Sequence, residues 1–362
     1  MKQKRRSPKQ RSRRTQPQRL YALVVPGIED LAAAELEAAG ARPGETLRRF
    51  DRRDSILLFD ADDPAPVLRC GLIEDVFAVL FDSPTPPSKS APRMLARTLD
   101  ADTLARAMRV HHVLRPRGGG RSYKAVVRVA GHHPFRREEV QSAFERAVGA
   151  LLPHWVRSPQ AASIEVWVHV VGERTIAGLR LSDDTLAGRR YKHAHLEASL
   201  KPPVARALVV LSGPRPGDVV VDPMAGAGTV VRERLDAGRA RIAMGGDIDP
   251  AALAAARQNA GRRPALARWD ATRLPLRSAS VDAIITNPPY GRRHEAPGGV
   301  AALYRGAMKE AARVLRPGGR CVVLTGEPEA LRAALPPALL VRSTRRLVVR
   351  GLTATAFVLA RR

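Results

Sequence analysis

The segment NPPYG, at Asn287–Gly291, combines residue types that can hold an amino group attached to an aromatic ring. The consecutive prolines Pro288 and Pro289 remove two N–H donors and fix φ at about −65°. They therefore form a stiff loop that offers hydrogen-bond acceptors. The side-chain oxygen of Asn287 and the carbonyl of Pro288 can both accept hydrogen bonds from one –NH2 group. The ring of Tyr290 can stack on a planar base. We predict that these four residues select an aromatic amine and orient it for reaction; the alternative is a rigid loop that only ends a strand.

A glycine-rich segment, DPMAGAGT at Asp222–Thr229, lies between an apolar run and a predicted helix. Gly226 and Gly228 allow a tight turn and leave room for a ligand to approach the backbone, while the new helix presents unpaired N–H groups. Taken alone, such a loop is equally compatible with an ordinary strand-to-helix turn. The chain has no G-x-x-x-x-G-K-[ST] motif, which disfavours a nucleoside triphosphate as the ligand.

Two acidic segments follow the next two apolar runs. In GGDIDP, at Gly245–Pro250, Asp247 is placed to accept hydrogen bonds from both hydroxyls of a ribose, whereas Asp249 is predicted to cap the helix that begins with Pro250. In WDATRLPL, Asp270 can accept a hydrogen bond from an adenine amino group. Together with the glycine loop, these residues predict a nucleoside site. Its candidate residues are Asp222, Pro223, Gly226, Gly228, Thr229, Asp247, Ile248, Asp249, Asp270, Ala271 and Asn287.

The elements that position these segments begin at Gly217. Short apolar runs alternate with helical stretches, which predicts βαβ units and a mainly parallel sheet with helices on both faces; the runs are VVVDP, RIAMGGD, ALARWD, VDAIITN and CVVLT. In such folds ligands bind beyond the carboxyl ends of the strands, where all four segments lie. The final run RRLVVRGLTATAFVLA contains two strand-like halves joined at Gly351, and we expect an antiparallel pair that closes the sheet.

The upstream half is predicted to contain α+β structure. Leu20–Val25 is a strand candidate, a helical pattern ends at Gly40, and Ile56–Phe59 and Val76–Phe81 are two further strands. The Pro/Ser-rich run Ser83–Pro92 is interpreted as a linker. A second unit follows, with helices near 93–99, 101–113 and 137–152 and with strands at YKAVVRVA, IEVWVHVV and TIAGLRLS.

The charge of the chain favours a polyanionic partner. Its 362 residues include 61 Lys and Arg against 35 Asp and Glu, a formal charge of +26, although a GC-rich genome can also enrich arginine. Nine of these cations lie in residues 1–19, which have no acid and are predicted to be a disordered tail, either an arm on phosphates or a solvated extension. The remaining chain still has a charge of +17. Around the glycines of Arg115–Lys124, further cations could follow a phosphate backbone, and a solvated basic loop is an equal alternative.

Other classes of protein fit the sequence less well. The two cysteines, Cys70 and Cys321, are too distant in sequence for a short metal or redox motif and are predicted to be small buried residues of a reduced, cytoplasmic protein. The histidine pairs at 111–112 and 132–133 have no ligand-spaced partner, so we expect no metal site. We find no apolar run of membrane-spanning length and no secretory signal.

The segments DPMAGAGT, GGDIDP, WDA and NPPYG, in this order, resemble class I methyltransferases that methylate exocyclic amines with S-adenosylmethionine. Upstream, YALVVPGIEDLAAAEL resembles a ferredoxin-like domain, residues 91–182 resemble a THUMP domain, and Arg189–Leu208 resembles the connection into the catalytic domain. Nearly all of the chain after Leu20 is thus similar to THUMP-containing RNA guanine-N2 methyltransferases, particularly those that act on tRNA. Met224 and Ala225 depart from the bulkier or polar residues that this family often has in its glycine loop.

The fold class that this resemblance implies is α/β. A C-terminal Rossmann-like class I methyltransferase domain, with a mostly parallel seven-stranded sheet, is expected after an α+β ferredoxin-like domain and a THUMP domain. The implied boundaries are a tail at 1–19, the ferredoxin-like domain at 20–86, the THUMP domain at 87–182, a linker helix region at 183–212 and the methyltransferase domain at 213–362.

The resemblance also implies an activity and its partners. The cofactor is S-adenosylmethionine, and the product is N2-methylguanosine, with position six of the tRNA acceptor stem as the nearest match. The THUMP domain would hold the acceptor stem and 3′ end, and no obligate protein partner is expected. Candidate RNA contacts are Arg115, Arg117, Arg121, Lys124, Arg189, Arg190, Lys192, Arg292 and Arg293.

Rival functions remain open at this point. Guanine-N2 methylation of 23S rRNA is the main alternative within the family. A DNA adenine methyltransferase and a protein-glutamine methyltransferase use a similar NPPY loop, but the THUMP-like half and the +26 charge favour RNA. A non-catalytic RNA-binding protein is disfavoured because all four segments look intact.

Overall fold

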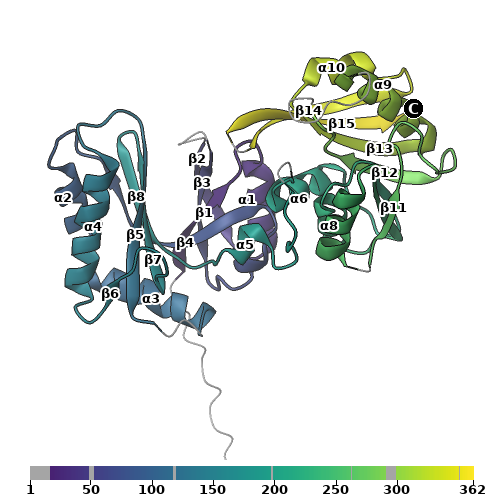
Figure 1. The fold of residues 1–362 in the computed structure, drawn as a ribbon. Coiled ribbons are helices and arrows are strands. Elements are labelled where there is room, and N and C mark those ends of the chain that lie inside the picture. Colours follow the sequence, from purple (N-terminus) through teal and green to yellow (C-terminus); the bar gives the residue numbers. More distant parts are fainter. Residues whose placement is uncertain are drawn as a thin grey trace, which may run out of the picture.

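Two β-sheets organise the chain. The computed structural model describes residues 17–48, 53–116, 120–196, 199–261, 263–290, 299–349 and 351–362. An eight-stranded sheet is built from the first half of the chain and a seven-stranded sheet from the second half, and a connecting segment with two helices runs between them (Figure 1). The two helices are α5 (Thr185–Gly188) and α6 (Pro202–Leu211).

The seven-stranded sheet has the strand order β11-β10-β9-β12-β13-β15-β14. Its first five strands are parallel and the last two are antiparallel, so the mostly parallel sheet with a closing antiparallel pair is confirmed. The strands are β9 (Val219–Asp222), β10 (Ile242–Asp247), β11 (Ala265–Arg268), β12 (Val281–Thr286), β13 (Leu315–Thr325), β14 (Leu339–Val349) and β15 (Leu352–Arg361). The helices are α7 (Thr229–Asp236), α8 (Pro250–Ala260), α9 (Gly299–Val314) and α10 (Pro328–Ala334).

Both faces of this sheet are buried, which explains why its strands are continuous apolar runs. Successive residues of a strand point to opposite faces. Val220 and Ile285 join the core that contains α6, whereas Val221 and Ile284 join a second core that contains α9 and α10. Burial on both faces is typical of a parallel sheet covered by helices.

The eight-stranded sheet has the strand order β2-β3-β1-β4-β8-β7-β5-β6. Its strands are β1 (Gln18–Val24), β2 (Arg42–Leu47), β3 (Ser55–Ala61), β4 (Ile73–Pro84), β5 (Ser122–Ala130), β6 (Val156–Arg157), β7 (Ile164–Val171) and β8 (Arg174–Arg180). The helical elements of this half are α1 (Glu29–Ala38), the 3-10 turn η1 (Val67–Arg69), α2 (Ala91–Arg97), α3 (Ala101–Leu114) and α4 (Arg137–Leu151).

Strand β4 joins the two units that the sequence predicts as separate domains. It pairs with β1 on one side and with β8 on the other, so the sheet continues across the predicted boundary at 86 and 87. Ser83 and Pro84, predicted as linker, instead belong to β4 and pair with Thr175 and Arg174. The division into a ferredoxin-like and a THUMP domain stays a prediction.

The N-terminal prediction also needs one correction. Gln18 and Arg19, predicted as part of the tail, begin β1, where Arg19 forms an ion pair with Asp82 at 3.1 Å. Residues 1–16 lie outside the described residues.

The C-terminal hairpin connects the two sheets. Val348 N donates to the Pro26 carbonyl at 3.0 Å, and Arg345 forms an ion pair with Asp30 at 2.5 Å. At the same contact Gly27 has φ +102°, and a Cβ there would lie 2.1 Å from the Arg346 carbonyl oxygen. Glycine is therefore required for this close approach.

Within the described ranges, no helix has both the length and the apolar character to cross a membrane. In the same part of the chain, no three histidine, cysteine or acidic side chains group in a way that could hold a metal ion. Cys70 and Cys321 are free and buried, as predicted, and burial raises the pKa of both thiols to about 12.

Candidate active site

The four segments singled out in the sequence all follow the carboxyl ends of neighbouring parallel strands. The glycine loop follows β9, the Asp247 segment ends β10, the Asp270 segment follows β11, and the NPPY loop follows β12. Since the strand order is β11-β10-β9-β12, the segments lie side by side at one edge of the sheet. The sheet therefore brings together the residues predicted to bind a cofactor and those predicted to bind an amine.

The glycine loop is fixed to the end of β10. Gly226 and Gly228 have φ values of +50° and +75°, which other residues rarely adopt. Gly226 N donates to Asp247 Oδ2 at 2.9 Å, and Ala225 N donates to the Gly246 carbonyl at 2.9 Å. A Cβ built on Gly226 would meet no atom within 4 Å, so the loop is open on that side. Pro223 and Thr229, at the two ends of this loop, are buried.

Asp247 has hydrogen-bonding capacity to spare for two hydroxyl groups. Besides the bond from Gly226, its Oδ1 accepts from Asp249 N at 3.1 Å. A carboxylate has about four acceptor positions, so two remain for a ribose. Asp249 caps α8 by accepting from Ala251 N at 2.8 Å, with Pro250 at the first helical position, which confirms the predicted capping role.

Ile248 presents an apolar side chain beside Asp247. It is 62% exposed, an unusual position for a large apolar residue at the tip of a strand. Asp270 is also exposed, and its Oδ1 accepts from Thr272 N at 2.8 Å and from Thr272 Oγ1 at 2.7 Å. Its second oxygen is thereby held in a fixed direction, while the neighbouring Ala271 is buried.

Trp269 is a site residue that the sequence reasoning missed. Its indole N–H donates to the Pro223 carbonyl at 3.0 Å, which ties the β11 segment to the glycine loop. Its ring lies against Gly246, where an added Cβ would be 1.9 Å from the indole. The signal in the sequence was the pair of glycines at 245–246, because a glycine inside a strand marks a close approach.

Asp222 is a buried acid at the start of the glycine loop. Burial raises its pKa to about 7, and the nearby charge of Asp247 acts in the same direction, whereas a hydrogen bond from Met224 N opposes the rise. Its protonation state is therefore sensitive to a cation placed in the loop.

These residues fit a nucleoside cofactor that bears a positive charge. The loop backbone is open at Gly226, Asp247 retains acceptors for the ribose, and Ile248 offers an apolar surface to a base. Asp222 and Asp247 place two carboxyl groups at the same edge. S-adenosylmethionine has the groups that these residues can bind, namely a ribose, a planar base and a positive charge.

The NPPY loop is closed by an internal hydrogen bond. Tyr290 Oη donates to Asn287 Oδ1 at 2.5 Å, and the ring of Tyr290 packs against Gly326 at the end of β13. Burial raises the pKa of Tyr290, so its hydroxyl keeps its proton. Pro288 is buried, and the Pro289 carbonyl accepts from Tyr304 Oη of α9 at 3.3 Å. Tyr304, which the sequence reasoning did not select, thus supports the loop from outside.

Seven of the nine predicted RNA contacts divide into three groups. Arg121 and Arg190 are exposed, and Arg115 is partly exposed. Lys124 forms an ion pair with Glu165 at 2.9 Å. The positions outside the described residues are Arg117, Arg292 and Arg293.

Arg189 and Lys192 have structural partners. Lys192 is buried, and its Nζ donates to the Leu200 carbonyl at 2.6 Å. Arg189 Nε donates to Glu233 Oε1 at 3.0 Å. Neither cation projects freely from the surface, because the connecting segment folds back onto the domains that it joins.

Asn259 is a second residue that the sequence reasoning missed. This buried side chain near the end of α8 donates to the Ala227 and Ala194 carbonyls, both at 2.9 Å, and accepts from Ala194 N at 2.8 Å. It therefore fastens the glycine loop to the connecting segment. An amide side chain near the end of an alanine-rich helix was the only signal, and the adjacent Gln258 gave no means of choosing between the two.

Comparison with known proteins finds methyltransferases that resemble this chain in sequence and in fold. A family profile described as "RMKL-like, methyltransferase domain" matches residues 189–355. A tRNA (guanine(6)-N2)-methyltransferase of Thermus thermophilus is 33% identical over 350 residues, which cover 94% of this chain and 98% of that protein. The crystal structure of TrmN from Thermus thermophilus is 29% identical, with a TM-score of 0.79 over 95% of this chain and 99% of that one. The bovine tRNA (guanine(6)-N(2))-methyltransferase THUMP3 is 29% identical over 225 residues, 58% of this chain and 44% of that protein.

The fold and the loops at the end of its parallel strands define a class I methyltransferase. The similarity to the bacterial relative extends through both halves of the chain. The chain belongs to the family of tRNA guanine-N2 methyltransferases that includes the Thermus thermophilus enzyme.

Proposed function

We propose that this protein transfers a methyl group from S-adenosylmethionine to the exocyclic N2 amine of a guanosine in tRNA, at position 6 of the acceptor stem. The observation that supports this best is the 33% identity along 94% of the chain to an enzyme named for that reaction. The NPPY loop beside an open glycine loop is the arrangement that the chemistry needs.

The amine is held by the acceptors of the NPPY loop. Asn287 Oδ1 has two lone pairs, and Tyr290 uses one of them, so the other can accept from the N2 amine. The Pro288 carbonyl accepts the second N–H. These two bonds favour a pyramidal nitrogen and aim its lone pair, which is delocalised into the ring in free guanine.

The cofactor is held by the neighbouring loops. S-adenosylmethionine supplies a methyl group activated by a sulfonium. Asp247 binds its ribose, Asp270 its adenine amino group, and the backbone from Gly226 to Thr229 approaches it closely. Asn287 is proposed to contact both the amine and the cofactor, because it directly follows β12 and β12 adjoins β9. The amine loses its extra proton readily after methyl transfer, so the mechanism needs no histidine base.

The eight-stranded sheet unit is the proposed RNA-binding half, with the acceptor stem and 3′ end as its ligand. A guanine paired in a stem has its N2 amine inside the stack, so the target base must flip out to reach Asn287. The reduced, buried cysteines agree with action in the cytoplasm.

Transfer of labelled methyl groups to tRNA, 23S rRNA and DNA, tested side by side, distinguishes the proposed substrate from its rivals. We expect label only in tRNA, as N2-methylguanosine at position 6 by nucleoside mapping. Asn287→Ala should lower turnover by at least about 100-fold, the size of effect seen when one catalytic hydrogen-bonding group is removed, while tRNA affinity stays the same. Label in rRNA or DNA alone, or full turnover by Asn287→Ala, would contradict the proposal.

A further inference from the structure

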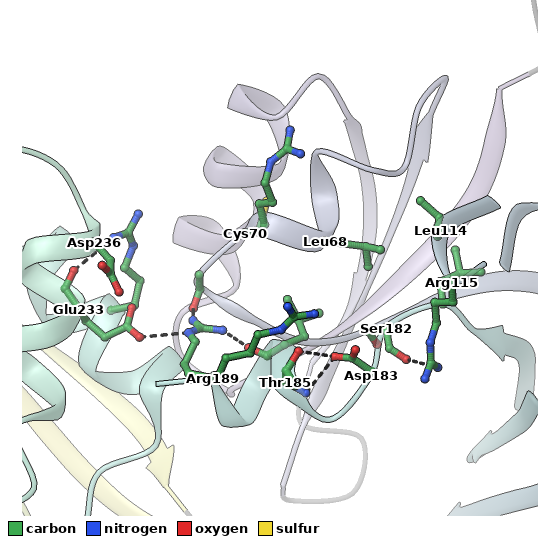
Figure 2. A pocket seen from close by; sticks show the side chains of 16 residues that line it. Leu68, Cys70, Leu114, Arg115, Ser182, Asp183, Thr185, Arg189, Glu233 and Asp236 are labelled. Atoms are coloured by element: carbon green, nitrogen blue, oxygen red, sulfur yellow. Dashed lines mark hydrogen bonds and ion pairs between the residues drawn. The ribbon is translucent and has the colours of Figure 1, made fainter. Parts of the chain in front are cut away.

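A cavity of about 430 Å³ lies between the two halves of the molecule (Figure 2), and Asn287–Tyr290 are not among the residues that line it. Its walls come from η1 and Gly71, from the end of α3, from the segment around α5, from α6 and from the end of α7. Five arginines line it, namely Arg69, Arg115, Arg189, Arg190 and Arg206, and the acids among its lining residues are Asp183, Glu233 and Asp236.

Arg189 builds the cavity rather than binding a ligand in it. Its guanidinium donates to Glu233, to the Gly71 carbonyl at 2.5 Å and to the Leu186 carbonyl (Figure 2). It also has φ +60° and ψ +137°, a backbone conformation that costs energy for a residue other than glycine. Arg189 therefore uses its donors to join three segments of the cavity wall.

Two of the three acids are already neutralised. Glu233 accepts from Arg189 and, at 2.7 Å, from Tyr191 Oη. Asp236 forms an ion pair at 2.8 Å with Arg232, which is outside the cavity lining. Only Asp183 remains, and its Oδ1 already accepts from Thr185 N at 2.9 Å.

The other arginines keep donors available. Among the described residues, the exposed side chains of Arg69 and Arg190 have neither a hydrogen bond nor an ion pair. Arg115 makes one hydrogen bond, from Nη1 to the Ser182 carbonyl at 3.1 Å (Figure 2). Arg206 Nη1 donates to the Glu233 carbonyl at 3.4 Å and Nη2 lies 3.6 Å from Glu35 Oε1, whereas its Nε is buried without a hydrogen-bond partner. The cavity thus offers more guanidinium donors than acceptors. Burial of the remaining acid, Asp183, is outweighed by the hydrogen bonds from Thr185, which lower its pKa, and the charges of Arg115 and Arg190 act in the same direction.

We propose that this arginine cavity, defined by Arg69, Arg115, Arg190 and Arg206, binds a phosphodiester of the RNA backbone; the inference rests on the proposed function. Guanidinium forks match the oxygens of a phosphate group in pairs, which a lysine cannot do. The volume is within the range of about 300–1,000 Å³ typical of small-molecule sites and leaves room for sugars on both sides of a phosphate.

The position of the cavity favours RNA over a free phosphate ion. Helices α5 and α6, which contribute to its lining, lie between the two sheets (Figure 1), so an RNA that is bound by the first half of the chain and modified by the second would pass this junction. Helix α7 runs from the glycine loop at Thr229 to the cavity at Asp236, about 12 Å for its eight residues. The bound phosphate therefore belongs to a nucleotide other than the one that is methylated.

The test is the double variant Arg69→Gln/Arg190→Gln in the full-length protein. Both side chains are exposed, so folding should be preserved, and thermal unfolding checks this. We expect the Kd for tRNA to rise about tenfold and the slope of log Kd against log salt to fall by about 1, as expected for one lost phosphate contact. The Kd for S-adenosylmethionine should stay the same. Arg69→Lys/Arg190→Lys should recover the salt slope but only part of the affinity.

The matched control is Arg277→Gln/Arg342→Gln, which removes two exposed arginines away from the cavity and should leave the salt slope unchanged. An equal change in both double variants would mean a general charge effect and would overturn the proposal. Inorganic phosphate is titrated in parallel. Saturable phosphate binding that needs Arg190, with an unchanged salt slope for tRNA, would assign the cavity to a free ion and reject RNA. If wild-type protein binds tRNA but does not methylate it, only the proposed function fails, because the salt slope reports the cavity separately.

Discussion

Tyr290 and Asn287 are hydrogen-bonded to each other, with 2.5 Å between Tyr290 Oη and Asn287 Oδ1. The sequence predicts separate roles for them, one stacking on a base and one accepting from its amine. The structure adds a contact between the two side chains, in which the phenol of Tyr290 fixes the orientation of the Asn287 amide. Because the phenol donates, one lone pair of Oδ1 stays available, and the amide cannot flip without losing the bond.

Tyr290→Phe should separate the two roles of Tyr290. It keeps the ring but removes the donor, so the amide of Asn287 loses its orientation. We expect kcat to fall about 10-fold with little change in KM for tRNA, since the lost bond is worth about 1 kcal/mol or more. Tyr290→Ala should lower kcat further and raise KM because it also removes the stacking ring. A wild-type kcat in Tyr290→Phe would show that the hydrogen bond has no part in positioning, and equal losses in the two variants would show that the ring has none.

Gly246→Ala should damage the cofactor site through packing. The added Cβ would lie 1.9 Å from the ring of Trp269, and that ring cannot move without breaking its bond to the Pro223 carbonyl. We expect a loss of about 1–3 kcal/mol in unfolding free energy and a weaker Kd for S-adenosylmethionine. Gly188→Ala is the matched control, since nothing lies within 4 Å of a Cβ there. Denaturant unfolding and calorimetry check both, and an unchanged cofactor affinity in Gly246→Ala would argue against a role for Trp269.

Local patterns in the sequence were sufficient to predict the parallel strands of the catalytic half and the segments that meet at their ends. Strands β9, β10 and β12 are short apolar runs, and the glycine and acidic segments at their ends must meet wherever the strands are parallel. The first half was less predictable because β4 pairs with β8, about a hundred residues later, and no local pattern encodes that partner. Strand β2 was missed because Pro43 and Gly44 indicate a turn, whereas an edge strand with a bulge tolerates both.

The contacts of single side chains were the least predictable part of the site. Arg189 and Lys192 are cations in the segment that resembles the connection into the catalytic domain, and the sequence predicts both as RNA contacts. Their partners, Glu233 and the Leu200 carbonyl, come from elements that the sequence could not place beside them. Arg69 and Arg206 are the converse case, since they were not selected and the fold brings them to the same cavity as Arg190.

Arg189→Met should reveal a structural role for Arg189. Glu233 is buried, and burial raises its pKa even with the guanidinium present. Removing Arg189 leaves this carboxyl with Tyr191 and costs about 3–5 kcal/mol, the usual penalty for breaking a buried pair. Glu233→Gln should cost less because its amide oxygen can still accept from both partners. Unfolding free energies measure these losses. If Arg189→Met unfolds like wild type and only tRNA affinity falls, the residue is an RNA contact as the sequence predicts.

Asp222 should make stability depend on pH in an unusual direction. Burial raises its pKa to about 7 from an ordinary value of 3.8, so the folded protein holds the proton more tightly than the unfolded chain. Stability from this group is complete below about pH 4 and is lost as pH rises through about 7, with a slope of up to about 1.4 kcal/mol per pH unit. Asp222→Asn should remove that slope.

Denaturant unfolding between pH 4 and pH 8 measures the effect as the difference between wild type and Asp222→Asn. The difference is needed because burial also raises the pKa of Glu74 to about 7, which adds a similar slope to both proteins. A cationic cofactor near Asp222 favours the ionised carboxyl, so its affinity should rise with pH through the same window in wild type and remain flat in Asp222→Asn. Parallel stability curves for the two proteins would mean that Asp222 is already ionised in the folded state. A flat wild-type affinity would place the cofactor's charge away from this carboxyl.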